Sequence, residues 1–403
     1  MPVTRASTPT RGRRAALAAC VVALGTVAAC GSPTTGAPQH GASASSSTSS
    51  TLAAPWQGTL VVSGLPAPVQ SLQAVSCATA PRCWAVGSSV ATSAAPSGPV
   101  VVASANGGAT WKVLPLPTGI GYLADIACGT TRACTAVGQA GASGVGPGVI
   151  LTTTNGGATW ASQAVPTGTT DVTAVSCRAN VPCTALGTVA GRVTTLTPGG
   201  TAGAWVPGGP LPPAASVATS LACTDSQHCW ATASDTTDPS HAVGSIDTSA
   251  DGGATWVPQT VPAGTGAINS VDCVSVATRS NSRNVTCTAV GTTSTVLNGT
   301  RTGQGVVLTS SGSATWTSEP VPASVADLLD ISCGAGPCVA VGATVATAAQ
   351  GGVVVLTPAT GASATIWRRS ATVAVALPLT GVSCVSLAAC TVVGESVSAR
   401  LAA

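Results

Sequence analysis

The cysteines are the residues whose type and spacing most clearly offer chemistry. Beyond residue 55 they fall into seven pairs, and five of these pairs enclose five residues each. The pairs are Cys77 and Cys83, Cys128 and Cys134, Cys177 and Cys183, Cys223 and Cys229, Cys273 and Cys287, Cys333 and Cys338, and Cys384 and Cys390. Such pairs can form disulfides, ligate a metal through thiolates or supply a nucleophilic thiol.

The spacing favours disulfides over the other two chemistries. A zinc site typically uses Cys-x2-Cys spacing with further cysteines or histidines, and the pairs do not follow that pattern. Seven equivalent pairs are a feature of a scaffold, whereas a thiol catalyst would be singular. We therefore predict seven local disulfides, each stabilising the fold by about 2 kcal/mol, and no metal or cofactor.

A second group of residues with chemical potential lies in one loop. Asp235, Asp238 and His241 form the densest polar cluster in the chain. Carboxylates beside an imidazole can bind a metal or transfer protons. Three such residues in one loop are more often only solvated, so we assign them a candidate role in binding and no more. Arg301, in a later loop, is a further candidate of this kind.

The segments that must position these residues form a repeat. First cysteines of successive pairs recur about every 50 residues, a period typical of repeat proteins. Each unit has an apolar strand ending at the first cysteine, a polar turn, a strand opening at the second cysteine, a variable loop and a third strand. The sequence SADGGATW (249–256) follows a third strand and returns as SANGGATW (104–111) and TTNGGATW (153–160), each leading into a Trp-containing fourth strand.

The pattern Ser/Thr-x-Asp-x-Gly-x-Thr-Trp resembles the Asp-box, or BNR, repeat of bacterial sialidases, sortilin-type receptors and the photosystem II stability/assembly factor. Only Asp251 carries the aspartate, whereas Asn106 and Asn155 replace it in the other two copies. In those families the motif lies on the turn between the third and fourth strands of a propeller blade. Because the motif is a structural device, the resemblance implies a fold and not an activity.

We predict an all-β, seven-bladed β-propeller over residues 56–403, with four-stranded antiparallel blades and one disulfide hairpin per blade. The last unit, from Leu379, lacks a Trp strand, and the first Trp strand, Trp56 to Pro66, has no unit before it. This N-terminal strand should pair with three C-terminal strands and so remove both sheet edges. A hydrophobic content of 45% suffices for a large core, and the 7% of charged residues form no basic patch for nucleic acid.

Antiparallel blades place the disulfide and box turns on one face and the loops between second and third strands on the other, where loops commonly carry function. We expect the residues six positions before the first cysteine to mark the mouth of the central channel. In three units these residues are Tyr122, Asp171 and Asp327. Asp125 and Asp330, three residues before the cysteine, would add to a polar mouth. The alternative is that these groups bond to nearby backbone.

A sialidase-like glycoside hydrolase is the main catalytic alternative. The resemblance implies three converging arginines, a tyrosine nucleophile with a glutamate partner and an acidic aspartate. The chain has only Glu319 and Glu395, and Arg82, Arg132 and Arg178 fall in the disulfide turns, on the face opposite the variable loops. No other catalytic motif is present, so the sequence favours a protein that is not an enzyme.

The N-terminal segment indicates export. Arginines precede an apolar run, Ala15 to Ala29, that is short for a membrane span. The run ends in Val27-Ala28-Ala29-Cys30, which looks like a bacterial lipobox and implies cleavage after a signal peptide (1–29) and lipidation of Cys30. An ordinary signal peptide is the alternative. Residues 30–55, rich in Ser, Thr, Gly and Ala, predict a flexible tether.

These features predict a monomeric lipoprotein at the outer face of the cytoplasmic membrane, or a secreted protein, that acts as a non-catalytic binding or scaffold module. Its partner would be an envelope protein or an envelope glycan, and the lipid on Cys30 would hold it on the membrane. A carbohydrate-binding protein or a sialidase-like glycoside hydrolase is the alternative function.

Overall fold

The computed structural model divides the chain into two compact units, Met1–Ser49 and Ser50–Ala403, and all of the described residues belong to the second. The described residues are 59–402 apart from 94–95, 142–145, 200–202, 214, 236–242, 278–282, 294–295, 298–299, 302, 312–313, 335–337, 345–352, 360–365, 374–377 and 387. Cys30, the predicted signal peptide and the whole of the predicted tether lie outside them.

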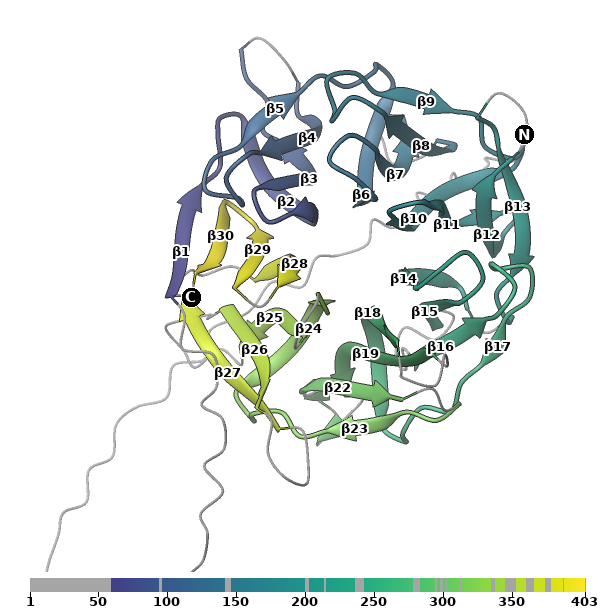
Figure 1. Ribbon diagram of the computed structural model, residues 1–403, viewed down its shortest axis with the longest axis vertical. Helices are drawn as coiled ribbons and strands as arrows, with labels where there is room; N and C mark the ends of the chain where they lie inside the picture. Colours follow the sequence, from purple (N-terminus) through teal and green to yellow (C-terminus); the bar gives the residue numbers. More distant parts are fainter. Residues whose placement is uncertain are drawn as a thin grey trace, which may run out of the picture. The chain divides into compact units, whose positions relative to one another are not determined.

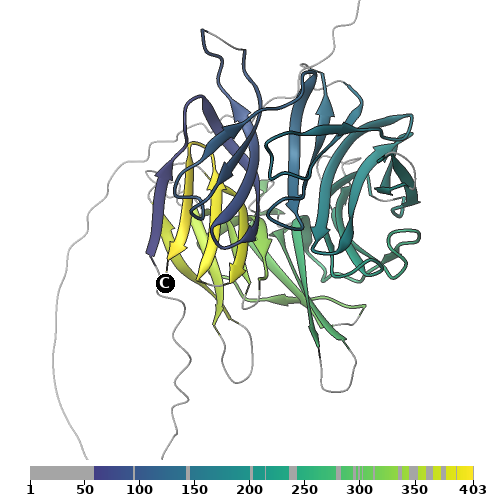
Figure 2. The same cartoon turned by 45° about the horizontal axis from the view of Figure 1, so that its top comes forward.

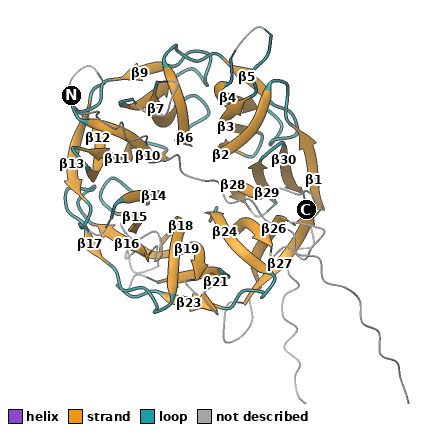
Figure 3. Cartoon of the chain, turned by 180° about the vertical axis from the view of Figure 1, so that it is seen from behind, coloured by secondary structure: helices purple, strands orange, loops and turns teal. Residues whose placement is uncertain are grey.

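The described residues form seven four-stranded antiparallel sheets and one two-stranded ribbon (Figures 1 and 3). Six sheets, blades 1 to 6, each come from one continuous segment. Blade 1 has β2 (Val69–Thr79), β3 (Arg82–Ser89), β4 (Gly98–Ser104) and β5 (Lys112–Leu114); blade 2 has β6 (Ile120–Cys128), β7 (Cys134–Ala140), β8 (Gly148–Thr153) and β9 (Ala161–Gln163); blade 3 has β10 (Thr169–Arg178), β11 (Val181–Val189), β12 (Arg192–Pro198) and β13 (Trp205–Pro210).

The second half of the chain continues this order. Blade 4 has β14 (Val217–Cys223), β15 (Cys229–Asp235), β16 (Val243–Ser249) and β17 (Val257–Pro258); blade 5 has β18 (Thr265–Ala277), β19 (Arg283–Thr293), β22 (Gly305–Ser310) and β23 (Thr317–Glu319); blade 6 has β24 (Val325–Ser332), β25 (Val339–Thr344), β26 (Val353–Ala359) and β27 (Ile366–Val373). The ribbon of β20 (Val296–Leu297) and β21 (Thr300–Arg301) is inserted between β19 and β22.

The remaining four-stranded sheet is composite. It joins β1 (Thr59–Gly64) to β30 (Val397–Ala402), which is followed inward by β29 (Ala389–Gly394) and β28 (Leu379–Ser386). We predicted seven propeller blades, and this count is corrected to six blades, each made by one continuous segment. The composite sheet, which no single segment makes, completes the ring. The reason is the position of β1, which is separated in sequence from the other strands of its sheet.

The first strands of the sheets line the centre of the ring. Each of β2, β6, β10, β14, β18, β24 and β28 contacts the next, and β28 contacts β2 (Figure 1). The turned view in Figure 2 shows the strands of each sheet running side by side between the two faces of the ring. Clusters of Val, Leu, Ile, Ala and Trp fill the spaces between neighbouring sheets, as Trp84, Val101, Leu123 and Leu151 do between blades 1 and 2.

All seven predicted disulfides are present. They join the predicted pairs across the hairpin between the first two strands of each four-stranded sheet. We call this end of the ring the disulfide face, and the opposite end, where second strands lead into third strands, the loop face. A set of disulfides of this size is typical of exported proteins, because the cytosol keeps thiols reduced.

The turns between third and fourth strands also lie on the disulfide face. In the copy at 249–256, Ser249 Oγ accepts the N–H of Gly253 and donates to Asp251 Oδ1, both at 2.8 Å. Asp251 then accepts the N–H and the hydroxyl of Thr255, and these bonds lower its pKa to about 2. Gly252 and Gly253 have φ of 74° and 88°, which explains the glycine pair.

Asparagine serves equally well in the other two copies. Asn106 Oδ1 accepts the N–H of Thr110 at 2.9 Å, and its Nδ2 donates to the Thr110 hydroxyl. Asn155 makes the same bonds with Thr159. Rotation of the threonine hydroxyl therefore accommodates either side chain. The following Trp111, Trp160 and Trp256 lie just before β5, β9 and β17 and do not start these strands.

Candidate functional site

Polar side chains near the first cysteines tie the inner strands into a closed ring. Each accepts a backbone N–H from the inner strand of the next sheet, at 2.7–3.3 Å. The bonds run to Ser76 from Cys128, to Asp125 from Val175, to Ser176 from Cys223, to Ser220 from Val271, to Asp272 from Cys333, to Asp330 from Val382, to Ser332 from Cys384, and to Ser383 from Cys77.

The acceptor residue lies at one of two positions in the strand, so that no junction between sheets lacks a bond. Most sheets place Ser or Asp one residue before the first cysteine. Blades 2 and 4 have Ala127 and Ala222 there, and Asp125 and Ser220, two residues earlier, accept the bond from the next sheet instead. Every junction between inner strands therefore has at least one such bond.

These side chains surround a central cavity of about 650 Å³. Its lining runs from four residues before the first cysteine of a sheet to two residues after it, and includes Asp125, Arg178, Asp272 and Asp330. Tyr122, Asp171 and Asp327, predicted to mark the channel mouth, are not part of this lining. The cavity therefore lies nearer the disulfide face than the sequence repeat suggested.

The three carboxylates in the cavity are engaged by backbone. Asp125 accepts the N–H groups of Ile126 and Val175 at 2.7 and 2.9 Å, and Asp272 accepts those of Cys273 and Cys333 at 2.8 and 2.7 Å. Burial raises the pKa of both, against the effect of these bonds. Because each carboxylate has a structural role at a sheet junction, two free carboxylates for glycoside hydrolysis are not available among them.

The carboxyl of Asp330 is held by hydrogen bonds in the same way. Its Oδ1 accepts the N–H of Ile331 and the hydroxyl of Ser270, and its Oδ2 accepts the N–H of Val382. Burial raises its pKa to about 7, and the negative charge of Asp125 adds to this shift. A perturbed carboxyl is a common mark of a functional site, but here the full set of hydrogen bonds gives it a structural explanation.

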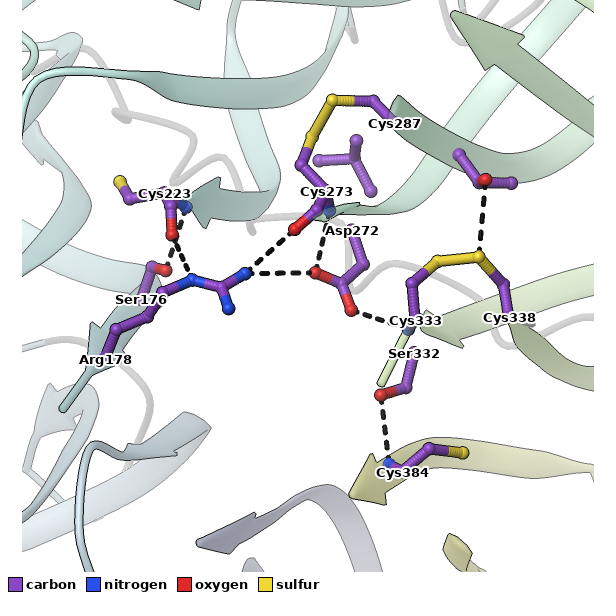
Figure 4. A network of polar contacts seen from close by, with 12 residues as sticks. Ser176, Arg178, Cys223, Asp272, Cys273, Cys287, Ser332, Cys333, Cys338 and Cys384 are labelled. Atoms are coloured by element: carbon purple, nitrogen blue, oxygen red, sulfur yellow. Dashed lines mark hydrogen bonds and ion pairs between the residues drawn. A yellow bond between two sulfur atoms is a disulfide. The ribbon is translucent and has the colours of Figure 1, made fainter. Parts of the chain in front are cut away.

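Arg178 crosses the disulfide end of the cavity (Figure 4). Its Nε donates to the carbonyl of Cys223, and its Nη2 donates to the carbonyl of Cys273 at 2.9 Å and lies 3.7 Å from Asp272 Oδ1. The guanidinium thus links blade 3 to blades 4 and 5, although 41% of the side chain is exposed. The sequence analysis placed Arg178 correctly at a disulfide hairpin but missed its position over the channel.

The predicted mouth residues lie near the loop-face ends of the inner strands. Asp171 Oδ1 accepts the N–H of Thr188 at 3.0 Å, within its own blade. Asp327 Oδ1 accepts from Asn269 Nδ2 at 3.0 Å, and burial raises its pKa to about 6. Tyr122 is 44% exposed. The structure does not bring these three residues together with a shared partner.

The other predicted binding residues are also on the loop face, where they are described. Asp235 ends β15, and Arg301 lies in the ribbon, paired in register with Val296. Asp238 and His241 lie outside the described residues, as does the lipidation candidate Cys30. Within the described ranges, no group of three or more His, Cys, Asp or Glu side chains is arranged to hold a metal ion.

Exposed large hydrophobic side chains distinguish the loop face from the disulfide face. Val90, Tyr122, Val217 and Val243 are 41–54% exposed at strand ends of the loop face. The other exposed large hydrophobics of the described chain lie on outer strands, at Val61, Val62, Val113, Val206 and Val257. The loop face therefore carries exposed apolar side chains as well as the carboxylates of Asp171, Asp235 and Asp327, and Val243 is the strand partner of Asp235.

Asp272 is the cavity carboxylate that the sequence analysis missed. It stands one residue before Cys273, where most other sheets have serine. An aspartate in place of serine at one position of a repeat was the available signal.

The described residues include no helix with the length and hydrophobicity needed to cross a membrane.

No protein-family model matches the sequence, and no curated protein matches it either. Among solved structures, the chain is similar to YCF48 from Cyanidioschyzon merolae (14% identity, 85% of this chain and 98% of that one, TM-score 0.41). It is also similar to a streptogramin B lyase (10% identity, 85% of this chain and 97% of that one, TM-score 0.55). A third similar structure is the α-L-arabinofuranosidase Arb93A from Fusarium graminearum (11% identity, 86% of this chain and 98% of that one, TM-score 0.45). At these identities the likeness concerns the fold alone. The chain is thus an all-β propeller with four-stranded antiparallel blades.

Proposed function

We propose that this protein is an exported, membrane-anchored propeller that binds an envelope protein through its loop face and catalyses no reaction. The observation that carries the proposal is the exposed apolar surface at Tyr122, Val217 and Val243 on that face. Exposed aromatic and aliphatic side chains beside polar ones are typical of protein-binding surfaces. The carboxylates of the cavity, by contrast, are occupied by backbone N–H groups.

The turn geometry supports the resemblance to Asp-box repeats. The Ser249, Asp251 and Thr255 side chains close the turn through their own hydrogen bonds and leave no group of the turn for catalysis. Under this proposal the box turns and disulfides hold the ring rigid, and the loop face carries Tyr122, Asp171, Asp235, Asp238, His241, Arg301 and Asp327 as candidate contact residues.

Photo-cross-linking on intact cells tests where the partner binds. A photoreactive residue in place of Val243, which is 54% exposed on the loop face, should capture one discrete protein. The matched control replaces Val257, which is 58% exposed on an outer strand of the same blade, and should capture none. Capture of glycan alone from Val243 would favour the carbohydrate-binding alternative, and turnover of aryl glycosides by the purified protein would overturn the non-catalytic proposal.

Membrane anchoring is tested separately. Cys30→Ser removes the sulfur that the lipobox would use, so the protein should move from the membrane fraction to the medium, because a diacylglyceryl group is sufficient for stable anchoring. Cys20→Ser, the matched control, should leave the protein in the membrane fraction. Unchanged retention of the Cys30→Ser protein would contradict the lipoprotein proposal.

A further inference from the structure

We propose that the disulfide face docks on the surface of an anionic phospholipid membrane. The proposal rests on the anchoring proposed above for the direction in which the propeller faces. It assigns a role to the face that the binding proposal leaves unused.

Four arginines lie in an arc on the disulfide face. The arc runs over four neighbouring sheets of the ring, from the composite sheet through blades 1, 2 and 3. Its members are Arg400, Arg82, Arg132 and Arg178, and all four side chains are exposed. Within the described part of the chain, only Arg178 has an ion-pair partner, Asp272. The arc therefore presents largely uncompensated positive charge.

Two hollows on this face each contain one of the arginines. Arg400 lies beside Pro81 and Asn106 in a hollow of about 350 Å³ between the composite sheet and blade 1. Arg178 lies beside Gly129 and Asn180 in a hollow of about 340 Å³ between blades 2 and 3. Arginine binds phosphate oxygens through two parallel N–H bonds, so the recessed Arg400 suits a phospholipid headgroup. The Arg178 guanidinium is bonded to the carbonyls of Cys223 and Cys273 and adds only its charge to the arc.

Three carboxylates on the disulfide side of the ring, Asp125, Asp272 and Asp330, lie in the central cavity, where each accepts a backbone N–H. On the disulfide face, Asp225 and Asp251 belong to blade 4, outside the arc, and Asp225 is bonded to His228. Four other carboxylates, Asp171, Asp235, Asp327 and Glu395, lie toward the loop face, where Arg192 and Arg301 are also found. The exposed charge along the arc itself is therefore positive, and charge complementarity favours an anionic surface beneath it.

The path of the chain selects a membrane as that surface. β1 is the outer strand of the composite sheet, and Thr59 at its start pairs with Ala402 at the disulfide-face end of β30. The segment that precedes Thr59 therefore enters the propeller on the disulfide face. The tether predicted from the composition of residues 30–55 would have a root-mean-square span of roughly 30 Å. A lipid on Cys30 would thus keep this face close to the bilayer and turn the loop face outward.

Co-sedimentation with vesicles tests the proposal. The full chain carrying Cys30→Ser is mixed with vesicles of 30% phosphatidylglycerol in phosphatidylcholine, or of phosphatidylcholine alone. Arg82→Gln or Arg132→Gln should each lower the partition coefficient on the anionic vesicles about fivefold, and the triple variant that also carries Arg400→Gln roughly a hundredfold. Arg192→Gln, which removes the same charge from the loop face, should change it less than about twofold on the same scale.

Three results would overturn the proposal: no salt-sensitive preference for the anionic vesicles, an equal loss on Arg192→Gln, or stronger binding to soluble polyphosphate than to vesicles. The outcome is independent of the anchoring test. If Cys30→Ser releases the protein from cells but the arginine variants bind vesicles as the parent does, the anchor stands and the docking face is wrong. If the arginine variants lose binding to vesicles but Cys30→Ser changes nothing in cells, the docking face stands and the anchor is wrong.

Discussion

Asp330 Oδ2 accepts the backbone N–H of Val382 at 2.7 Å and so joins β24 of blade 6 to β28 of the composite sheet. The same carboxyl accepts the hydroxyl of Ser270 from blade 5. Asp330→Ala leaves both donors unpaired and should lower the free energy of unfolding by about 2 kcal/mol. Urea denaturation measures the change. Asp225→Ala, in an exposed disulfide hairpin, is the control, and an equal loss for both variants would contradict the structural role of Asp330.

The carboxyl of Asp330 should also make stability depend on pH. Its pKa is raised to about 7 in the folded protein, against roughly 3.9 in an unfolded chain. The folded state therefore binds this proton more tightly, and its contribution to stability is complete below about pH 4 and lost as the pH rises toward 7. In Asp330→Asn, the fall in melting temperature between pH 4 and 7 should be shallower than in the parent. A parallel fall in both proteins would show that another group is responsible.

The tryptophans at or just before the start of the fourth strands bury their indole N–H against the preceding sheet, and whether it finds an acceptor depends on one residue of that sheet. Trp256 Nε1 donates to Thr195 Oγ1 of the preceding blade at 2.8 Å, and Trp111 Nε1 donates to Ser398 Oγ of the composite sheet at 2.9 Å. Nε1 of Trp160, Trp316 and Trp367 is buried without a partner among the described atoms. Thr195 and Ser398, the acceptors for Trp256 and Trp111, occupy the same position of the third strand in their sheets. At that position, the blades that precede Trp160, Trp316 and Trp367 have Val101, Ile246 and Val307, which cannot accept a hydrogen bond.

Val101→Thr should therefore give Trp160 an acceptor. Val101 and Trp160 already belong to one packed cluster, and threonine has nearly the shape of valine. We expect a gain of about 1 kcal/mol in the free energy of unfolding, although a buried valine-to-threonine change normally costs stability. Val102→Thr is the control: the neighbouring side chain packs in a different cluster, with Trp111, and should lose stability. Destabilisation by both substitutions would refute this dependence.

The repeat made the strand order and the disulfides predictable, because both follow from spacing along the chain. The cavity was less predictable. The inner strands contain register shifts, as between Leu123 and Asp125, and these bulges change which side chains reach the channel. Arg178 was placed at a hairpin from its position after Cys177, but its bond to the carbonyl of Cys273 spans 95 residues. Contacts of that kind depend on ring closure and leave no local pattern in the sequence.

Asp247 occupies a core position where four of the other five blades have leucine. It pairs with Ala231 as Leu151 pairs with Ala136 and Leu308 with Ala289. Its side chain is 1% exposed, and Oδ1 has no hydrogen-bond partner among the described atoms. Burial raises its pKa to about 6, so the ionised form weakens the fold.

Removing this carboxyl should stabilise the protein in a pH-dependent way. The folded-state pKa exceeds the unfolded value, so the cost is absent below about pH 4 and develops as the pH rises through 6. Asp247→Asn, which keeps the shape, should raise the free energy of unfolding by about 2 kcal/mol at pH 8 and change it little at pH 4. Asp247→Leu should add the benefit of apolar burial at both pH values. If Asp247→Asn gives the same difference at pH 4 and pH 8, the buried charge is not the cause; if Asp247→Leu destabilises at pH 8, the position has a structural or functional role that its neighbours in the repeat lack.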